Sequence, residues 1–280
     1  MQTATPWWVL RDSPRRENIL CSVTTHRMSR ITRRKFLGLS ALALPAIALG
    51  AHHSFSETTT LRVTKLKTGP GHCRFVHFTD FHHKGDVEYA AEVVRTINQL
   101  APDFVCFTGD LVEEVRFAPE ALAFIRQIEA PVFGSPGNHD FQSGVAFSDF
   151  REAFTATGGA WLADESAPIA QHGVEIVGMG RKGVHGFGAR RADRQVLLMH
   201  YPAVANGLGR RFDLILAGHS HGGQIRLPLV GALLVPKGVG PYDHGYYETP
   251  GGPLYVNAGI GTYRIPFRWN CRPEITVITL

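Results

Sequence analysis

The sequence contains few cysteines, and they form no recognisable pattern. Only four occur in 280 residues, Cys21, Cys73, Cys106 and Cys271, and no two of them are closely spaced. This excludes a disulfide framework and a zinc-ribbon motif. Cys73 and Cys106 lie in or beside segments that we expect to be buried strands, where a thiol packs as a small apolar group.

The chain also lacks internal repeats and low-complexity runs, so nothing divides it into several domains. Its 280 residues, 44% hydrophobic and 19% charged, suffice for one large core. The net charge of +5 is concentrated near the start, because residues 1–51 carry eight basic and two acidic side chains. Residues 52–280 therefore have a net charge of −1, which excludes a broad surface for nucleic acid. We expect a monomer.

No apolar run reaches the length of about 20 residues that spans a bilayer. The longest, residues 36–51, follows a basic stretch from Arg27 to Lys35, which is the pattern of a signal peptide. Residues 32–37 (TRRKFL) resemble a twin-arginine export signal, which predicts the twin-arginine machinery as a partner. The alternative is an uncleaved anchor. Both predict an exported domain, in the periplasm or on the outer face of the cytoplasmic membrane.

The first 27 residues show neither helical nor strand periodicity, and Met28 stands directly before the basic stretch. We therefore interpret residues 1–27 as an upstream extension outside the natural protein. Residues 28–51 are then the twin-arginine-like signal peptide or anchor, residues 52–60 a linker and residues 61–280 the folded domain.

Within this domain, apolar strand patterns alternate with helical ones, which predicts an α/β fold. Right-handed crossovers would place the ends of successive strands on one rim. The expected strands are 61–66, 75–78, 104–107, 132–133, 169–177 around a Gly173 turn, 196–199 and 213–217, and the expected helices are 87–100, one beginning near Pro119, and 144–156. Further strands near 224–227, 254–257 and 274–280 can form a second sheet.

Polar residues follow the ends of these strands in five blocks. Because alternate residues of an extended chain point to the same side, Asp80 and His82 can hold one ion. Glycines beside the polar residues allow the backbone to approach a site closely. The blocks are Asp80-Phe81-His82, Gly109-Asp110, Gly137-Asn138-His139-Asp140, His200 and Gly218-His219-Ser220-His221.

In this order, the blocks resemble the signature of the calcineurin-like metallophosphoesterases. The resemblance implies two β-sheets packed face to face with helices on the outside, a four-layer α/β/β/α fold. It also implies two divalent metal ions that share Asp110, and their mixed nitrogen and oxygen ligands suit Mn, Fe or Zn. One ion would be held by Asp80, His82, Asp110 and His221, and the other by Asp110, Asn138, His200 and His219.

The implied activity is that of a metal-dependent phosphoric ester hydrolase. A hydroxide that bridges the metals would attack phosphorus in line, while His139 assists the leaving group and Asp140 orients His139. No arginine directly follows Asp140, which favours phosphodiesters over monoesters, although Arg264, Arg268 and Arg272 can supply a clamp. Lipid-linked and other envelope phosphodiesters are among the candidate substrates.

Two alternatives remain open. Residues 218–224, 259–261 and 272–275 resemble bacterial exported or membrane-associated phosphodiesterases, some of which act as UDP-2,3-diacylglucosamine pyrophosphohydrolases of lipid A synthesis. That reaction is cytoplasmic, which the leader argues against. The second alternative is a non-catalytic scaffold with the same fold, which the complete set of ligands and His139 argue against.

Other histidines and a basic run carry weaker signals. We interpret His77, His172 and His185 as structural, whereas His83 and His244 can be structural or line the pocket. Residues 178–194 are rich in glycine and arginine. They can form a mobile loop that meets an anionic substrate or a solvated basic loop, and the second interpretation is favoured because such loops are common.

Overall fold

The computed structural model describes residues 57–71, 73–183 and 188–280. The predictions for residues 1–27 and 28–51, and for most of the linker 52–60, lie outside these residues. The end of the linker is folded: residues 57–59 are helical, and the Thr58 hydroxyl accepts a hydrogen bond from the Arg268 backbone N–H at 3.0 Å. None of the helices within the described residues is long and apolar enough to cross a membrane.

The first sheet has the strand order β1-β14-β2-β3-β4-β5. Strands β2 to β5 run parallel, while β14 pairs antiparallel with β2 and parallel with β1. The edge strand β1 alternates between half-buried and exposed residues, as its sequence predicts. The bounds are β1 (Arg62–Lys67), β2 (Arg74–Phe78), β3 (Val105–Phe107), β4 (Val132–Gly134), β5 (Ala160–Trp161) and β14 (Glu274–Thr279).

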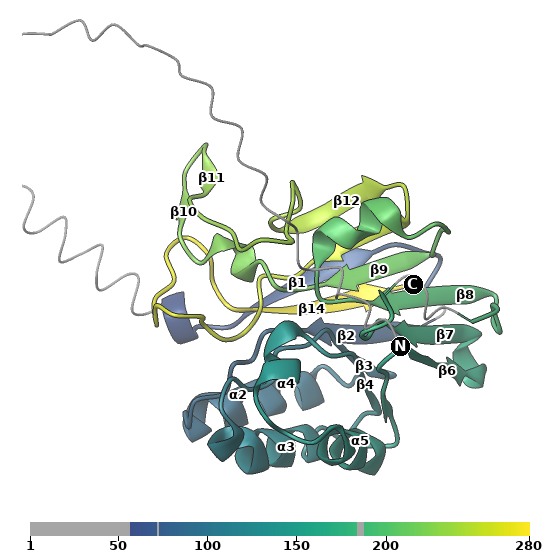
Figure 1. The fold of residues 1–280 in the computed structure, drawn as a ribbon, viewed down its shortest axis with the longest axis horizontal. Helices are drawn as coiled ribbons and strands as arrows, with labels where there is room; N and C mark the ends of the chain where they lie inside the picture. The colour runs from purple at the N-terminus through teal and green to yellow at the C-terminus, as the bar shows by residue number, and fades with distance from the viewer. Residues whose placement is uncertain (1–56, 72, 184–187) are drawn as a thin grey trace, which may run out of the picture. The chain divides into compact units, whose positions relative to one another are not determined.

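The helices cover one face of this sheet (Figure 1). The Asp86 side chain caps α2 by accepting the Tyr89 N–H, and the helix stops before Pro102, which cannot continue it. Pro119 lies in the first turn of α3, where its missing N–H costs nothing. Both helices are thus confirmed. The elements are α2 (Val87–Gln99), η1 (Val115–Phe117), α3 (Ala118–Arg126), α4 (Asn138–Gln142) and α5 (Phe147–Ala156).

The second sheet has the order β12-β13-β9-β8-β7-β6. The predicted turn at Gly173 is present, with a positive φ of 62° after the short helix η2 (Ala170–His172). The strands are β6 (Glu165–Ile169), β7 (Val174–Gly178), β8 (Arg194–Leu198), β9 (Leu214–Ala217), β12 (Gly245–Thr249) and β13 (Gly252–Val256).

The assignment of the last three predicted strands to the second sheet is right only for β13. Strand β14 lies in the first sheet, and β10 (Arg226–Leu227) pairs with β11 (Gly231–Ala232) in a separate hairpin. The apolar pattern of β14 identifies a buried strand but contains no information about its partners, β1 and β2, which lie about 200 residues earlier in the chain.

The core has three parts that correspond to the layers. Between the sheets, the Phe75 and Phe104 rings stack with centroids 4.6 Å apart and meet apolar side chains of β7, β8 and β9. On the helical side, Phe78 and Phe107 pack against α2, α3 and α5. The outer face of the second sheet is covered by η4 (Pro202–Gly207) and the adjoining Leu208. The predicted fold class, two stacked sheets with helices outside, is confirmed.

Candidate metal centre

The five polar blocks follow the ends of β2, β3, β4, β8 and β9. Because β2, β3 and β4 are parallel neighbours, and so are β8 and β9, the ends of each set meet at one edge of its sheet. The Asn138 block forms the start of the short helix α4, which the sequence did not predict.

Five of the predicted site residues adopt positive φ angles, a conformation that costs an L-residue about 1 kcal/mol or more. The expectation that Asp80 and His82 share one side of an extended chain is therefore wrong in its geometry. Left-handed corners, rather than regular strand, bring the side chains together. The φ angles are 53° for Asp80, 45° for His82, 61° for Asp110, 68° for His219 and 50° for His221.

One cluster consists of Asp80, His82 and His221, whose candidate ligand atoms all lie within 4.8 Å of one another. The Oδ1 atom of Asp80 lies 3.9 Å from Nε2 of His82 and 3.4 Å from Nε2 of His221. The Asp80 carboxylate also accepts the backbone N–H of His219 at 2.9 Å, which ties the end of β2 to the loop after β9.

A second cluster consists of Asp110, His200 and His219. Nε2 of His200 lies 3.1 Å from Oδ2 of Asp110 and 3.1 Å from Nδ1 of His219. The same Oδ2 atom lies 3.5 Å from Nε2 of His82 in the first cluster. The Asp110 carboxylate thus faces both clusters, as expected for a residue shared between two ions.

Several buried polar atoms of the site have no hydrogen-bond partner. Among the described residues these include Nε2 of His82, Oδ1 of Asn138 and Nδ1 of His221. Asn138 follows Gly137, where an added Cβ would lie 2.1 Å from Oδ1 of Asp110, so the two loops are in contact. Unpaired buried lone pairs are costly unless a ligand uses them, and imidazole, amide and carboxylate donors suit a divalent transition metal. The residues present fit such an ion.

The buried charges are balanced in pairs. Burial lowers the pKa of His82 and of His200, but the nearby carboxylates outweigh it and raise each pKa to about 9. Conversely, burial raises the pKa of Asp80 and of Asp110, and the histidines outweigh it, so both pKa values fall. Burial lowers the pKa of His221 to about 3, leaving a neutral imidazole that can ligate a metal.

Three groups that the motifs did not indicate hold the ligand rings. Nδ1 of His82 lies 2.8 Å from Oε1 of Glu113, which also pairs with Lys84 at 3.0 Å. The His200 and His219 rings are hydrogen-bonded to the backbone carbonyls of Thr108 and Lys237 at 2.7 and 2.8 Å. Such outer partners fix the ring orientation of a metal-binding histidine. The only sequence signal for Glu113 was its position three residues after Asp110.

Asp140 has a different role from the one expected. Its two carboxylate oxygens accept the backbone N–H groups of Gly137, Asp110 and Leu111 at 2.8, 2.8 and 2.9 Å, so these hydrogen bonds go to the backbone of two loops. The prediction that Asp140 orients His139 is therefore replaced: Asp140 holds the loop of α4 against the loop that bears Asp110. An acidic side chain buried at a helix start satisfies N–H groups that have no other partner.

His139 lies at the rim of the site and is half-buried. Its backbone N–H donates to Oδ1 of Asp110 at 2.8 Å, and its ring centroid is 5.0 Å from those of His82 and Tyr263. Burial lowers the pKa of its imidazole, opposed by the charge of Asp110. Tyr263, which the motifs did not indicate, also stacks near the His221 ring at 6.2 Å.

The remaining histidines are structural where the structure describes them. Burial lowers the pKa of His77 to about 3, and its ring is hydrogen-bonded to the Thr108 hydroxyl. His83 pairs with Glu120 and His244 with Glu274, so neither lines the site. His172 ends η2, and His185 lies outside the described residues.

The three arginines considered as substrate clamps differ in their burial and in their hydrogen-bond partners. Arg268 is fully buried and donates to backbone carbonyls, including those of Ala258 and Gly261. Arg272 donates to the carbonyls of Thr60 and Leu61. Only Arg264 is exposed beside the site, with its guanidinium 5.2 Å from the centre of the Tyr263 ring.

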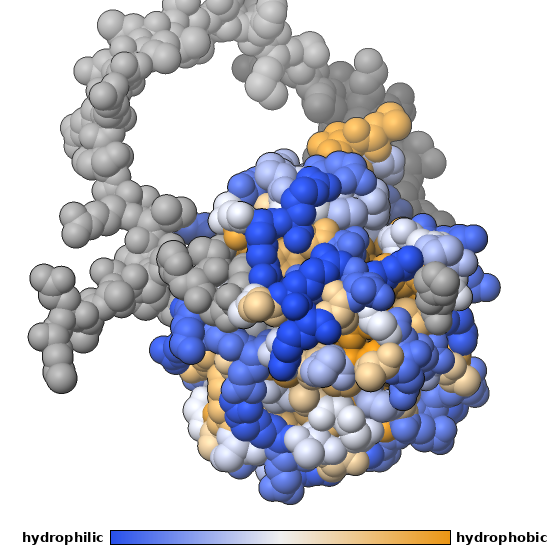
Figure 2. Space-filling model, turned by 90° about the vertical axis from the view of Figure 1, so that its right-hand side faces the viewer, coloured by the Kyte–Doolittle hydropathy of each residue, from blue (hydrophilic) through white to orange (hydrophobic). Residues whose placement is uncertain are grey.

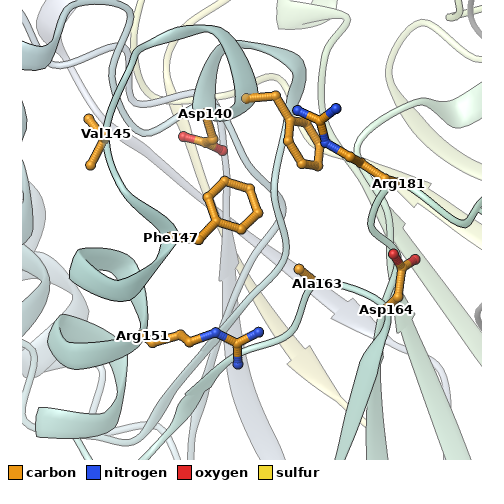
Figure 3. A pocket seen from close by; sticks show the side chains of 8 residues that line it. Asp140, Val145, Phe147, Arg151, Ala163, Asp164 and Arg181 are labelled. Carbon is orange, nitrogen blue, oxygen red and sulfur yellow. The ribbon is translucent and has the colours of Figure 1, made fainter. Parts of the chain in front are cut away.

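A cavity of about 430 Å³ is lined by residues of α4, of α5 and of the loops around residues 145, 164 and 181 (Figure 3). Of the predicted site residues, only Asp140 lines it. Arg181, from the basic run, lies over the Phe141 ring at 4.7 Å, and Arg151 pairs with Glu165 at 2.7 Å. Both cations are thus engaged by the chain itself.

Comparisons with known proteins agree with this arrangement. A family model described as calcineurin-like phosphoesterase matches residues 73–223, which contain all nine predicted site residues. The chain is 32% identical to the uncharacterized metallophosphoesterase YkuE of Bacillus subtilis (strain 168), over 90% of this chain and 99% of that protein. It is 26% identical to the phosphodiesterase YaeI of Escherichia coli (strain K12), over 89% of this chain and 99% of that one.

Proposed function

Because the chain belongs to the calcineurin-like phosphoesterases and is therefore a metal-dependent phosphoester hydrolase, we propose that it cleaves phosphodiesters with two divalent ions. The observation that carries the proposal is the position of Asp110, whose Oδ2 lies 3.5 Å from His82 and 3.1 Å from His200. One carboxylate between two sets of nitrogen ligands is what two adjacent cations require.

The chain offers a ligand set for each ion. Asp80, His82 and His221 would hold one, and Asn138, His200 and His219 the other, with Asp110 common to both. When bound, the ions supply positive charge for the phosphoryl oxygens and lower the pKa of an attacking water. Mn, Fe and Zn all suit these donors.

We propose that His139 acts on the leaving group. Its ring is half-buried at the rim beside His82 and Tyr263, and its backbone is fixed by the hydrogen bond to Asp110. Since burial lowers its pKa, the imidazole is neutral near pH 7 and its N–H can hydrogen-bond the departing oxygen. Glu113 and the Thr108 carbonyl hold the other rings in orientation.

Three observations support a phosphodiester as the substrate. No arginine directly follows the Asn138 block, and Arg268 and Arg272 are bound to backbone carbonyls. A second negative charge on a monoester would thus find Arg264 alone among these cations. The similar protein of Escherichia coli is named a phosphodiesterase.

Hydrolysis of bis(p-nitrophenyl) phosphate by the purified chain with added Mn²⁺ tests the proposal. We expect Asp110→Asn to abolish turnover, and His139→Ala to lower kcat about 100-fold or more. Asp149→Asn on the exposed side of α5 is the matched control and should turn over normally. An inactive parent chain with every divalent metal tried would favour the non-catalytic scaffold.

We further propose that the domain works outside the cytoplasmic membrane. The proposal is supported by the basic stretch, the pair Arg33-Arg34 and the apolar run that follows. Replacing both arginines with lysine should leave the chain in the cytoplasm in a fractionation experiment. If the double variant reaches the periplasm or the cell wall at parental levels, export does not depend on the twin-arginine signal.

A further inference from the structure

Exposed apolar side chains gather in one segment, residues 226–235, which we call the apolar hairpin. It comprises β10, β11 and the residues after them, and it stands out from the rest of the described chain (Figure 1). Leu229 is fully exposed, and Leu234 and Val230 are 83% and 72% exposed. Figure 2 shows a group of hydrophobic residues at the top of the molecule, and β10 and β11 occupy this height in Figure 1.

The chain segment that carries the hairpin has basic side chains but no acidic ones. Between Gln224 and Tyr242 the chain contains Arg226 and Lys237 but no acidic residue. Lys237 is exposed, and so is Arg264 in the neighbouring loop, where Ile265 adds another exposed apolar side chain. Arg226 pairs with Asp243 at 2.8 Å. Apolar side chains flanked by cations suit the boundary between the acyl chains and anionic headgroups of a bilayer.

The hairpin is attached directly to the metal centre. It follows η5 (His221–Gly223), and an added Cβ on Gly223 would meet Cβ of Ala232 at 2.4 Å. Leu233 donates its N–H to the carbonyl of Ile225 at 3.1 Å, and the Lys237 carbonyl is hydrogen-bonded to Nε2 of His219. A surface that holds the hairpin therefore lies close to the proposed ions.

We propose that the apolar hairpin inserts into the surface of an anionic phospholipid bilayer. Strands β10 and β11 have two residues each, so they bury little of the apolar surface of the hairpin. Insertion into lipid would remove this exposed apolar surface from water. Docking itself does not depend on the reaction. One consequence rests on the proposed function: the substrates are phosphodiesters presented at a lipid surface, within reach of the metal centre.

Insertion can be measured with a tryptophan at the tip. In the full chain, Leu229→Trp should show a blue-shifted emission and added quenching, relative to the parent, on vesicles of brominated phosphatidylglycerol. Thr155→Trp, on α5 at the opposite end of Figure 1, is the control and should show neither. Equal quenching at both positions, or none at Leu229→Trp, overturns the proposal.

A second variant separates docking from catalysis. Leu229→Glu with Val230→Glu and Leu234→Glu should weaken partitioning to phosphatidylglycerol vesicles at least about tenfold, while bis(p-nitrophenyl) phosphate turnover is kept. The control adds three charges elsewhere, by Ala123→Glu, Thr155→Glu and Ala156→Glu on α3 and α5. Turnover of a lipid phosphodiester in vesicles should fall only in the hairpin variant.

The possible failures are distinct. If the parent chain binds vesicles but hydrolyses no soluble diester, the proposed function fails and docking stands. If it hydrolyses the soluble diester and the hairpin glutamates change neither vesicle binding nor vesicle turnover, docking is overturned. If light scattering shows a parent dimer that the same glutamates dissociate, the hairpin binds a second copy of the chain instead, and the proposal is likewise overturned.

Discussion

Glu113 contributes to the metal centre without belonging to any of the polar blocks. Its carboxylate, 2.8 Å from Nδ1 of His82, leaves Nε2 facing Asp80 and Asp110. Removing such a partner frees the ring to rotate and lowers its basicity. We predict that Glu113→Gln weakens Mn²⁺ binding about 10-fold to 100-fold, measured by competition with a chelator. Glu114→Gln, on the neighbouring exposed side chain, should bind Mn²⁺ as the parent does.

Arg268 is a buried charged residue whose hydrogen bonds hold several loops together. It is fully buried, and its guanidinium donates to carbonyls of the loops that carry His221, Ala258 and Cys271. We predict that Arg268→Met lowers the free energy of unfolding by about 3 kcal/mol or more, because several buried carbonyls lose their donor.

Urea unfolding followed by circular dichroism checks this value. Arg264→Met is the matched control, since Arg264 is exposed, and it should change the unfolding free energy little. Parental stability for Arg268→Met would mean that water replaces the guanidinium at no cost.

The sequence predicted some residues of the site and missed others. The nine predicted site residues come from motif blocks at strand ends, and the structure brings their segments together. Glu113 and Tyr263 were missed, and Arg268 was considered only as a substrate clamp, because their partners lie far away in the chain: 31 residues separate His82 from Glu113, and 47 separate His221 from Arg268. Contacts between residues so far apart in the chain leave no local pattern in the sequence.

At the scale of elements, the loop after β9 must press against the end of β2. An added Cβ on Gly218 would lie 2.2 Å from Oγ1 of Thr79 and 2.3 Å from Oδ2 of Asp80. We predict that Gly218→Ala displaces this loop and lowers kcat/KM for bis(p-nitrophenyl) phosphate about 100-fold, since a shift of about 1 Å is enough for such a loss.

Gly207→Ala in η4 provides the control, because nothing lies within 4 Å of its added Cβ. The far-ultraviolet circular dichroism of both variants should match the parent. Full activity of Gly218→Ala would show that the loop can retreat without moving the ligands.

Elements with a periodic pattern or a continuous apolar run were predictable, and the strands without either were not. The apolar positions of α2 and the buried runs of β3 and β9 identify these elements by themselves. Strands β5 and β11 were not predicted, because two residues are too few to show alternation, whereas β10 was predicted near residues 224–227 but without its partner. The sheet to which β14 belongs is decided by pairing across the whole chain, so local sequence cannot supply it.

At the scale of the whole molecule, Glu274 joins the two sheets. It begins β14 in the first sheet and accepts a hydrogen bond from the Tyr255 hydroxyl of β13 in the second, at 2.7 Å. Its other oxygen lies 2.8 Å from Nε2 of His244 and 3.3 Å from the Arg62 guanidinium. Burial raises the pKa of this carboxyl, but His244 and the other partners outweigh it, so the pKa falls below its ordinary value of 4.5.

The ionised form of Glu274 therefore stabilises the folded chain above about pH 5, and this contribution is lost as the pH falls towards the lower pKa of the folded state. We predict that Glu274→Gln is less stable than the parent at pH 7, and that the difference shrinks between about pH 5 and pH 3. Urea unfolding across this range measures it. Glu248→Gln, at an exposed position of β12, should show no such trend, and a constant difference for Glu274→Gln would contradict the linkage.

The left-handed corners at Asp80, His82, Asp110, His219 and His221 have a consequence for protein design. On the regular strands of another scaffold, Asp80 and His82 would share one face, and so would His219 and His221, but without these corners their side chains would leave the backbone in other directions than they do here. A designer would first have to reproduce five unfavourable backbone turns and the packing that compensates for them. To move this centre into another protein, its loops and the layers that support them would therefore have to be transferred together with the ligand side chains.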